Sequence, residues 1–265
     1  MKNNNDVFSI HDIEHLSPSS INSYIDDPCI WIMRYLFKFR NGGGPAMWRG
    51  TVTDHGVGKY FGFTEKPIDL GETIQSALFE YQVTYDNCKS EYPTQEINHK
   101  KFLEEADRIP RYIKTAIDFY EDLGQPTEYQ KRIELNLESI PVPIIGFIDL
   151  KYNDTIRDIK TTARRPYKVS DAHARQVSVY AKAEDCVPIL DYIVVTAKDE
   201  QVVSETVHQV DKHIHTVEQV ALKIMNLLSY SNDKHEIANL FYPNLDDWKW
   251  GAEEIKFAKT IWSIK

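Results

Sequence analysis

The stretch GFIDLKYNDTIRDIKTTARRP, residues 146–166, decides the fold of this chain. Apolar and polar residues alternate over 142–152 and 155–160, which predicts two neighbouring strands of a hairpin. Asp149, Asp158 and Lys160 nevertheless stand where a strand usually has apolar residues or a turn. The segment therefore predicts a sheet and a charged site at the same place.

The two strands predict how these charges meet. Residues two apart in a strand share a face, so Asp158 and Lys160 point the same way while Ile159 points into the core. In a hairpin Asp149 lies beside Asp158 across the pair. Two adjacent carboxylates repel each other unless a cation lies between them or one is protonated. Mg²⁺ or Mn²⁺ suits such oxygen ligands, and a lysine beside them suits an anionic substrate or an activated water.

The composition of the whole chain limits its function. Its 265 residues are 42% hydrophobic and 27% charged, which suits one globular domain. The formal net charge of −9 argues against a general nucleic-acid coat protein but allows a local basic groove. The three cysteines form no C-x-x-C pair, and no apolar run is long enough for a secretory signal or a membrane span. We therefore expect a soluble cytoplasmic protein with no membrane partner.

The order of expected elements indicates an α/β fold. Residues 16–125 are expected to be mainly helical, with helices near 72–84 and 98–122 and an apolar helix after Pro28. Residues 126–210 carry the expected strands and one helix with Ser170 as its cap, and 211–265 are expected to be helical. The predicted architecture is a central mixed β-sheet flanked by helices, with an N-terminal helical elaboration, in a single domain over 1–265.

An ordered set of motifs identifies the chain as resembling one superfamily. The set is GFID, a spacing of nine residues from Asp149 to Asp158, then DIKTT and QVSVY. It resembles the PD-(D/E)XK nucleases, in particular the RecB-like exonuclease branch with phage-type and mitochondrial members. Upstream, LSPSSINSYIDDPCIWIMRYLF and MWRGTVTDHGV are similar to the N-terminal helix pair and the R-G-x-x-x-[E/H] helix of that branch. The resemblance covers about residues 16–186 and implies a restriction-endonuclease-like core.

The resemblance also implies roles for individual residues. The implied metal ligands for Mg²⁺ or Mn²⁺ are Asp54, Asp149, Asp158 and the backbone carbonyl of Ile159, and the implied catalytic residues are Lys160, Gln176 and Tyr180. Gln176 and Tyr180 are four residues apart, so they share one helical face.

Two departures from the family pattern bear on the metal chemistry. Asp54 stands where the branch usually has Glu or His, and the adjacent His55 is the alternative to it. Some relatives carry an iron–sulfur cluster with one early and three late cysteines. Here Cys29 matches the early position but no late cysteine follows Cys186, so we predict no cluster.

Basic residues near the expected site are candidates for contact with DNA. Arg164, Arg165 and Lys168 directly follow the strand that carries Lys160, although a solvated turn explains them nearly as well. Aromatic residues are also interleaved with basic ones over 29–40 and 47–50, a composition that suits stacking on unpaired bases. The candidates there are Arg34, Lys38, Trp48 and Arg49, of which the last two are favoured because they follow a glycine run.

These patterns favour a metal-dependent DNA exonuclease that acts on single-stranded or frayed linear ends in replication, recombination or repair. A structure-selective or restriction-like endonuclease of the same fold is the alternative, as is a catalytically silent DNA-binding module. A silent site has no physical reason to keep its motif residues, and this chain has all five: Asp149, Asp158, Lys160, Gln176 and Tyr180. The sequence leaves open the cleavage polarity, and whether the partner in the cell is a second copy of the chain or a recombination protein.

Overall fold

A five-stranded sheet lies at the centre of the computed structural model, which describes residues 6–64 and 66–264. The strands are β1 (Glu128–Leu135), β2 (Ile144–Lys151), β3 (Thr155–Thr162), β4 (Val187–Val195) and β5 (Glu200–Thr206). They are adjacent in the order β1-β2-β3-β4-β5, with β3 and β4 parallel and the other neighbouring pairs antiparallel. A parallel pair requires a crossover, and α8 (Asp171–Glu184) supplies it between β3 and β4. The predicted central mixed sheet is confirmed.

Helical segments precede and follow the sheet. They are α1 (Val7–Ile10), α2 (Pro18–Asp26), α3 (Pro28–Trp31), the π-helical turn η1 (Ile32–Leu36), α4 (Pro45–Tyr60), α5 (Leu70–Glu91), α6 (His99–Ala106), α7 (Ile109–Leu123), α9 (Val210–Leu228), α10 (Lys234–Ala238) and α11 (Ala252–Ile261). Local chemistry explains where several begin. Ser17 and Ser20 exchange side-chain and backbone hydrogen bonds at the start of α2, and Ser170 Oγ accepts the N–H of His173 at the start of α8. The predicted cap at Ser170 is confirmed.

Two expected helices differ in detail. The single helix expected over 98–122 is divided into α6 and α7, because Pro110 in the first turn of α7 has no N–H to continue the helix before it. The helix that starts at Pro28 widens after one turn into η1, where the N–H of Phe37 bonds the carbonyl of Ile32 at 3.0 Å.

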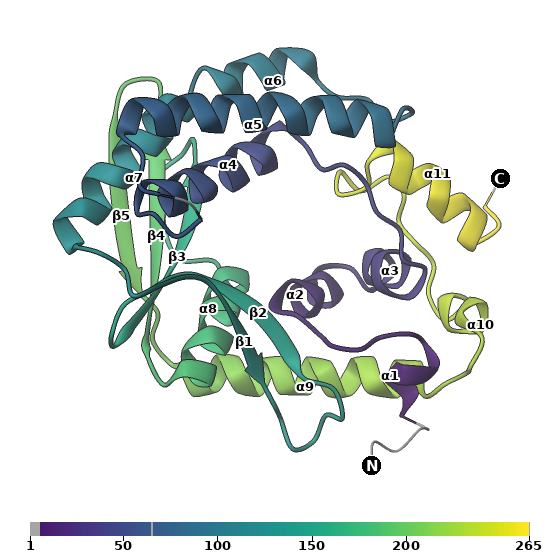
Figure 1. Ribbon diagram of the computed structural model, residues 1–265. Coiled ribbons are helices and arrows are strands. Elements are labelled where there is room, and N and C mark those ends of the chain that lie inside the picture. The colour runs from purple at the N-terminus through teal and green to yellow at the C-terminus, as the bar shows by residue number, and fades with distance from the viewer. Residues whose placement is uncertain (1–5, 65, 265) are drawn as a thin grey trace.

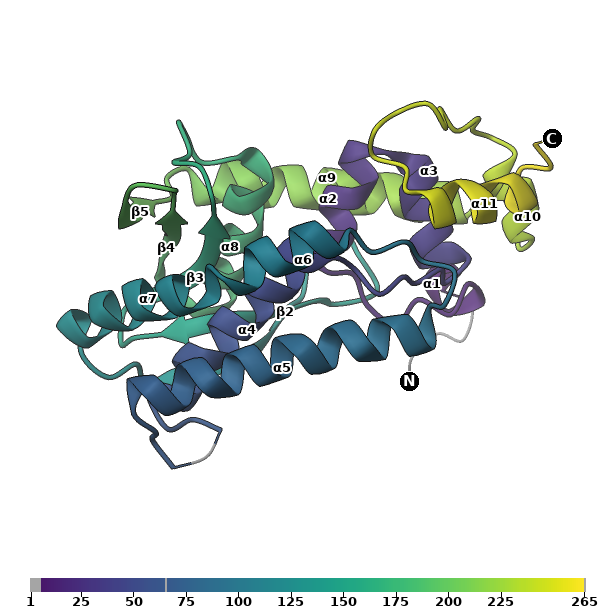
Figure 2. The same ribbon diagram turned by 90° about the horizontal axis from the view of Figure 1, so that it is seen from above.

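Helices cover both faces of the sheet (Figures 1 and 2). On one face α8 contacts β1 to β4 and packs against α9, while on the other α7 contacts β4 and β5 and packs against α4. The apolar core follows this division: Ile148 and Ile156 belong to the cluster of α8 and α9, and Ile159 and Ile193 to that of α4 and α7. Across residues 6–64 and 66–264, every helix is too short or too polar to cross a bilayer.

The strands β2 and β3 pair briefly and then diverge (Figure 1). Leu150 pairs with Arg157 and Lys151 with Ile156 next to the connecting turn. Farther along, the N–H of Ile159 donates to a side chain, Asp149 Oδ2, at 2.7 Å. The divergence therefore leaves room between the two strands for the charged side chains that they carry.

The glycine of the GFID motif makes room for an aromatic ring. A Cβ atom on Gly146 of β2 would lie 2.4 Å from Cε1 of Tyr180, which α8 presents to the sheet. Tyr180 is 4% exposed, so its ring has little space to withdraw. The small residue at 146 is thus a packing requirement of Tyr180.

We expect Gly146→Ala to destabilise the protein by about 1–3 kcal/mol, because the added methyl group overpacks a filled core. Urea unfolding measures this loss. In a Tyr180→Ala background the same substitution should cost clearly less, since the ring that it meets is gone. An equal cost in both backgrounds would show that another contact excludes the side chain.

Candidate metal and active site

Three carboxylates from three elements meet where β2 and β3 diverge. Asp54 comes from α4, Asp149 from β2 and Asp158 from β3. The side-chain amide of Gln130 on β1 links two of them: its Nε2 lies 2.7 Å from Asp54 Oδ2 and 3.1 Å from Asp149 Oδ1. The hydroxyl of Tyr129 also donates to Asp54 Oδ2, at 3.2 Å. Residues far apart in sequence thus form one acidic cluster.

The surroundings of the cluster disfavour the charged forms of its carboxylates. Burial raises the pKa of Asp149 well above its usual value, and the nearby charges of Asp158 and Asp54 raise it further. Burial also raises the pKa of Asp54, to about 6, although the charge of His55 and hydrogen bonds from Tyr129 and Gln130 oppose this shift. A cation between these carboxylates would favour their charged forms.

Lys160 supplies one positive charge inside the cluster. Its ammonium forms an ion pair with Asp158 Oδ2. Burial by itself lowers the pKa of Lys160, but the charges of Asp158 and Asp149 outweigh it and raise the pKa above the usual value. Lys160 therefore stays protonated at neutral pH, where it can stabilise negative charge but cannot act as a general base.

Gln176 and Tyr180 reach the same site from α8. Gln176 Nε2 donates to Asp158 Oδ1 at 3.1 Å and to the hydroxyl oxygen of Tyr180 at 2.9 Å. Burial and the charge of Asp158 raise the pKa of Tyr180, so its hydroxyl stays protonated. The structure thus brings together Asp54, Asp149, Asp158, Lys160, Gln176 and Tyr180 from the predicted set.

The oxygen atoms of this cluster suit a hard divalent cation. Asp54 Oδ1 is buried without a hydrogen-bond partner among the described residues, and Asp158 Oδ2 has the ammonium of Lys160 beside it. Carboxylate oxygens are the ligands that Mg²⁺ and Mn²⁺ prefer. Within the described part of the chain, however, no group of three or more His, Cys, Asp or Glu forms a ready metal cage. The donor chemistry fits, while part of each carboxylate's capacity is taken by Gln130, Ile159 and Lys160.

The structure distinguishes Asp54 from its neighbour His55. Asp54 shares the hydrogen-bond donor Gln130 with Asp149, whereas His55 Nδ1 forms an ion pair with Glu80 on α5. The hydrogen bond that His55 donates to Glu80 is also the main reason that the pKa of His55 is raised. Successive residues of a helix point about 100° apart, so only one of the two can face the cluster. Asp54 takes that position.

Two predicted DNA-contact residues are buried, which corrects the prediction. Trp48 is 2% exposed, packs against Tyr81 and donates its indole N–H to the carbonyl of Gly42 at 2.7 Å. Arg49 is 5% exposed and forms a buried ion pair with Glu105. A helix must bury one face, and α4 buries the face that carries both residues.

Arg49 instead joins two parts of the site. Its guanidinium donates to the carbonyl and hydroxyl oxygens of Thr161 on β3, both at 3.1 Å, and lies 4.6 Å from the ring centre of Tyr112. Arg49 precedes Asp54 on the same helix, and Thr161 follows Lys160 on the same strand. The guanidinium therefore fixes the distance between the helix that presents Asp54 and the strand that presents Lys160.

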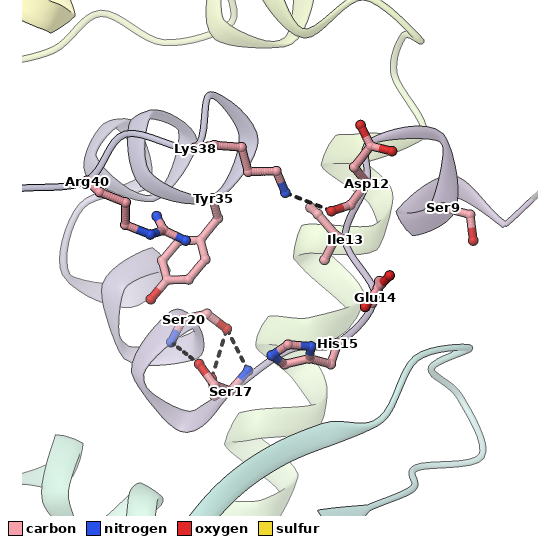
Figure 3. Close-up of a pocket in the computed structure, with 10 residues that line it drawn as sticks. All are labelled: Ser9, Asp12, Ile13, Glu14, His15, Ser17, Ser20, Tyr35, Lys38 and Arg40. Atoms are coloured by element: carbon pink, nitrogen blue, oxygen red, sulfur yellow. Dashed lines mark hydrogen bonds between the residues drawn. The ribbon is translucent and has the colours of Figure 1, made fainter.

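Arg34 and Lys38 lie away from the carboxylates. Arg34 donates to Glu254 of α11 at 3.2 Å, and Lys38 donates to the carbonyl of Asp12 at 2.8 Å. Lys38 lines a pocket of about 410 Å³ beside α2, where the guanidinium of Arg40 lies over the ring of Tyr35, 5.9 Å from its centre (Figure 3). Acidic side chains, Asp12 and Glu14, line the same pocket, so its charge is mixed.

The basic loop after β3 is on the surface. Arg164, Arg165 and Lys168 are all exposed, between the strand of Lys160 and the helix of Gln176. Tyr167 in the same loop is fully exposed, a residue that the sequence reading did not single out. The exposure of these basic residues leaves the loop a candidate for contact with a polyanion.

Sequence reasoning also missed Gln130 and Tyr129. Both lie in a stretch that reads as an ordinary strand, and neither belongs to a motif. Gln130 adopts the left-handed conformation, with φ at 47°, which is rare in a residue that is not glycine. No feature of the sequence predicts a left-handed residue at position 130, so only the structure could identify Gln130.

Comparison with known proteins gives one family and one shared fold. The sequence model of the PD-(D/E)XK nuclease superfamily matches residues 15–238. A crystal structure named "Putative exonuclease" from Eubacterium rectale shares the fold, with a TM-score of 0.52 and 14% identity over 84% of this chain and 85% of that one. The structure of SSO0001 is less similar, with a TM-score of 0.30 and 18% identity over 51% of this chain and 68% of that one. No curated protein matches the sequence.

We expect Arg49→Met to destabilise the protein by about 3–5 kcal/mol, because it removes the guanidinium from a buried ion pair. Urea unfolding measures the loss. Arg49→Lys keeps a charge near Glu105 but cannot also reach both Thr161 oxygens, so it should recover only part of the stability. A full recovery by lysine would mean that the contact with β3 is unimportant.

We expect Asp54 to give the metal-free protein a distinct pH dependence. Its pKa is about 6 in the folded protein and near 3.8 in the unfolded chain, so the folded state holds the proton more tightly. The penalty for ionising Asp54 is absent at low pH and develops as the pH rises from about 4 through 6. Urea unfolding with chelator should show Asp54→Asn gaining stability over the wild type across that interval. A constant difference from pH 4 to 8 would contradict the raised pKa.

Proposed function

Because the chain belongs to the PD-(D/E)XK nuclease superfamily, we propose that it is a divalent-metal-dependent DNA exonuclease. The gathering of Asp54, Asp149, Asp158 and Lys160 from three elements carries this proposal. Phosphodiester cleavage requires positive charge near a negatively charged phosphate, which these carboxylates would provide by holding a divalent cation beside Lys160. The fold shared with the structure from Eubacterium rectale supports the same reaction class.

The residues of the cluster would divide the chemistry between them. The three carboxylates and the carbonyl of Ile159 would hold Mg²⁺ or Mn²⁺, which when bound offsets the charge of the phosphate and acidifies a water. Lys160, which stays protonated, would donate to the phosphate oxygen on which negative charge develops. Gln176 holds Asp158 and Tyr180 in fixed orientations through its two hydrogen bonds.

The exposed loop over 163–170 would guide the DNA backbone to the cluster. Arg164, Arg165 and Lys168 can pair with phosphates, and the fully exposed ring of Tyr167 can stack on an unpaired base. Stacking favours single-stranded or frayed DNA, as arises in replication, recombination or repair, because the bases of a duplex are already stacked. Arg34 and Lys38, being farther from the carboxylates, would contact DNA outside the site of cleavage.

Contacts hold the N-terminal helices and the glycine run against the rest of the fold. α2 packs against α8 and α9, and Asn22 of α2 donates to the carbonyl of Ala172 at 2.9 Å. Residues 41–43 are also held, since Asn41 donates to Glu254 and Gln95 bonds Gly42 and Gly43. Support for the proposed preference for DNA ends comes from family resemblance and from the exposed loop.

We expect cleavage to require Mg²⁺ or Mn²⁺ and to be lost in Asp149→Asn, Asp158→Asn and Lys160→Ala. Gel analysis of end-labelled DNA with metal or with chelator measures this. Asp154→Asn, which changes an exposed carboxylate in the turn between β2 and β3, is the matched control and should cut like the wild type. Full activity in excess chelator would refute the proposal.

The form of the DNA distinguishes the exonuclease from its alternatives. Linear single strands should be shortened progressively from an end, while a closed single-stranded circle of equal length should persist. Equal cutting of the circle would identify an endonuclease of the same fold. Binding without cutting under every metal condition would identify a silent DNA-binding module.

A further inference from the structure

Gln130 makes direct hydrogen bonds to two of the three carboxylates. Its Nε2 lies 2.7 Å from Asp54 Oδ2 and 3.1 Å from Asp149 Oδ1. A terminal amide nitrogen carries two hydrogens, so one nitrogen can satisfy both acceptors. Without such a donor, two carboxylates at this separation would repel each other and turn apart. Gln130 thus links α4 to β2 through a neutral group.

The backbone at Gln130 is arranged to make this contact. Tyr129 pairs with Leu150 and Lys131 with Ile148, so Gln130 lies opposite Asp149 in the register of β1 and β2. Its φ of 47° is left-handed, which is unfavourable for a residue with a Cβ atom. A strained conformation persists only where the surrounding structure compensates for it, and such residues gather at functional sites.

The left-handed residue also reverses the direction of its neighbours. Residues two apart in a strand normally share a face. Here the hydroxyl of Tyr129 reaches Asp54 of α4, whereas the ammonium of Lys131 reaches Glu184 at the end of α8, at 2.7 Å. These helices lie on opposite faces of the sheet (Figures 1 and 2). The reversal at Gln130 therefore allows one strand to support the cluster with both Tyr129 and Gln130.

The remaining hydrogen bonds fix which oxygens stay available. Asp149 Oδ2 accepts the N–H of Ile159 at 2.7 Å, so both of its oxygens have donors. Asp54 Oδ2 has donors from Gln130 and Tyr129, while Asp54 Oδ1 is buried without a hydrogen-bond partner among the described residues. A carboxylate oxygen has two lone pairs, so one that accepts a hydrogen bond can still bind a cation.

We propose that Gln130 is a positioning residue that orients Asp54 and Asp149 for a divalent cation. The inference rests on the proposed function, because it assumes that the carboxylates bind metal. Hydrogen-bonded partners of ligating carboxylates set the direction of the ligand oxygens, and their loss typically lowers metal affinity or activity by about 10–100-fold. Gln130 fulfils that role from a strand that carries no motif.

Manganese binding to the DNA-free protein, followed by electron paramagnetic resonance of free Mn²⁺, tests the proposal. Gln130→Asn keeps an amide and suits a left-handed backbone, but its side chain is one methylene shorter and cannot bridge the two carboxylates. We expect it to bind Mn²⁺ about tenfold more weakly while its melting temperature changes little, because asparagine favours the left-handed backbone and this gain offsets the lost hydrogen bonds. Gln201→Asn makes the same change on β5, away from the cluster, and should bind Mn²⁺ like the wild type.

A second variant separates the amide from the backbone strain. Gln130→Gly removes the side chain and relieves the left-handed conformation, so it should weaken Mn²⁺ binding at least as much as asparagine while keeping or raising the melting temperature. Wild-type affinity in both variants would overturn the inference and leave the proposed function intact. Failure of the wild type to bind Mn²⁺ would overturn both.

Discussion

Mutual repulsion among three neighbouring carboxylates is the constraint on which the site depends. Asp54, Asp149 and Asp158 come from a helix and two strands. The charge of Asp158 raises the pKa of both Asp54 and Asp149, and the charge of Asp54 raises the pKa of Asp149 further. The protein offsets this repulsion with one ammonium, one backbone N–H and one bridging amide, which belong to Lys160, Ile159 and Gln130. Bringing these carboxylates together lowers the stability of the metal-free protein. A bound cation would remove the repulsion between them, so the same arrangement favours cation binding.

The cluster has space because β2 and β3 pair over only part of their length. The two strands that carry Asp149 and Asp158 pair at the turn and then diverge, so side chains occupy positions that backbone hydrogen bonds would otherwise fill. The helices on either face then contribute from opposite sides, Asp54 from α4 and Gln176 from α8. Stability and function compete at this point of the fold, and the hydrogen bond from Ile159 to Asp149 keeps the opening from widening.

Buried polar contacts hold the surrounding elements at fixed distances. Arg49 connects α4 with β3 and with Glu105 of α6, and so couples the helix that presents Asp54 to the strand that presents Lys160. A similar cluster on the α7 side joins Arg157, Asp191 and Tyr120. Buried ion pairs add little net stability, but they penalise arrangements in which a charge loses its partner. They therefore favour the one arrangement in which the three carboxylates and Lys160 meet.

The sequence by itself determined the mixed sheet, most helix positions and the motif residues that converge at the site, because alternation, caps and spacing are properties of neighbouring residues. The α8 helix with its cap at Ser170 and the pair Gln176 and Tyr180 illustrate this. Only the tertiary structure decided that Trp48 and Arg49 are buried and that Gln130 bridges two carboxylates. Those outcomes depend on partners far along the chain, such as Glu105 for Arg49 and Asp54 for Gln130. No local pattern specifies such partners, since they become neighbours only when the helices pack against the sheet.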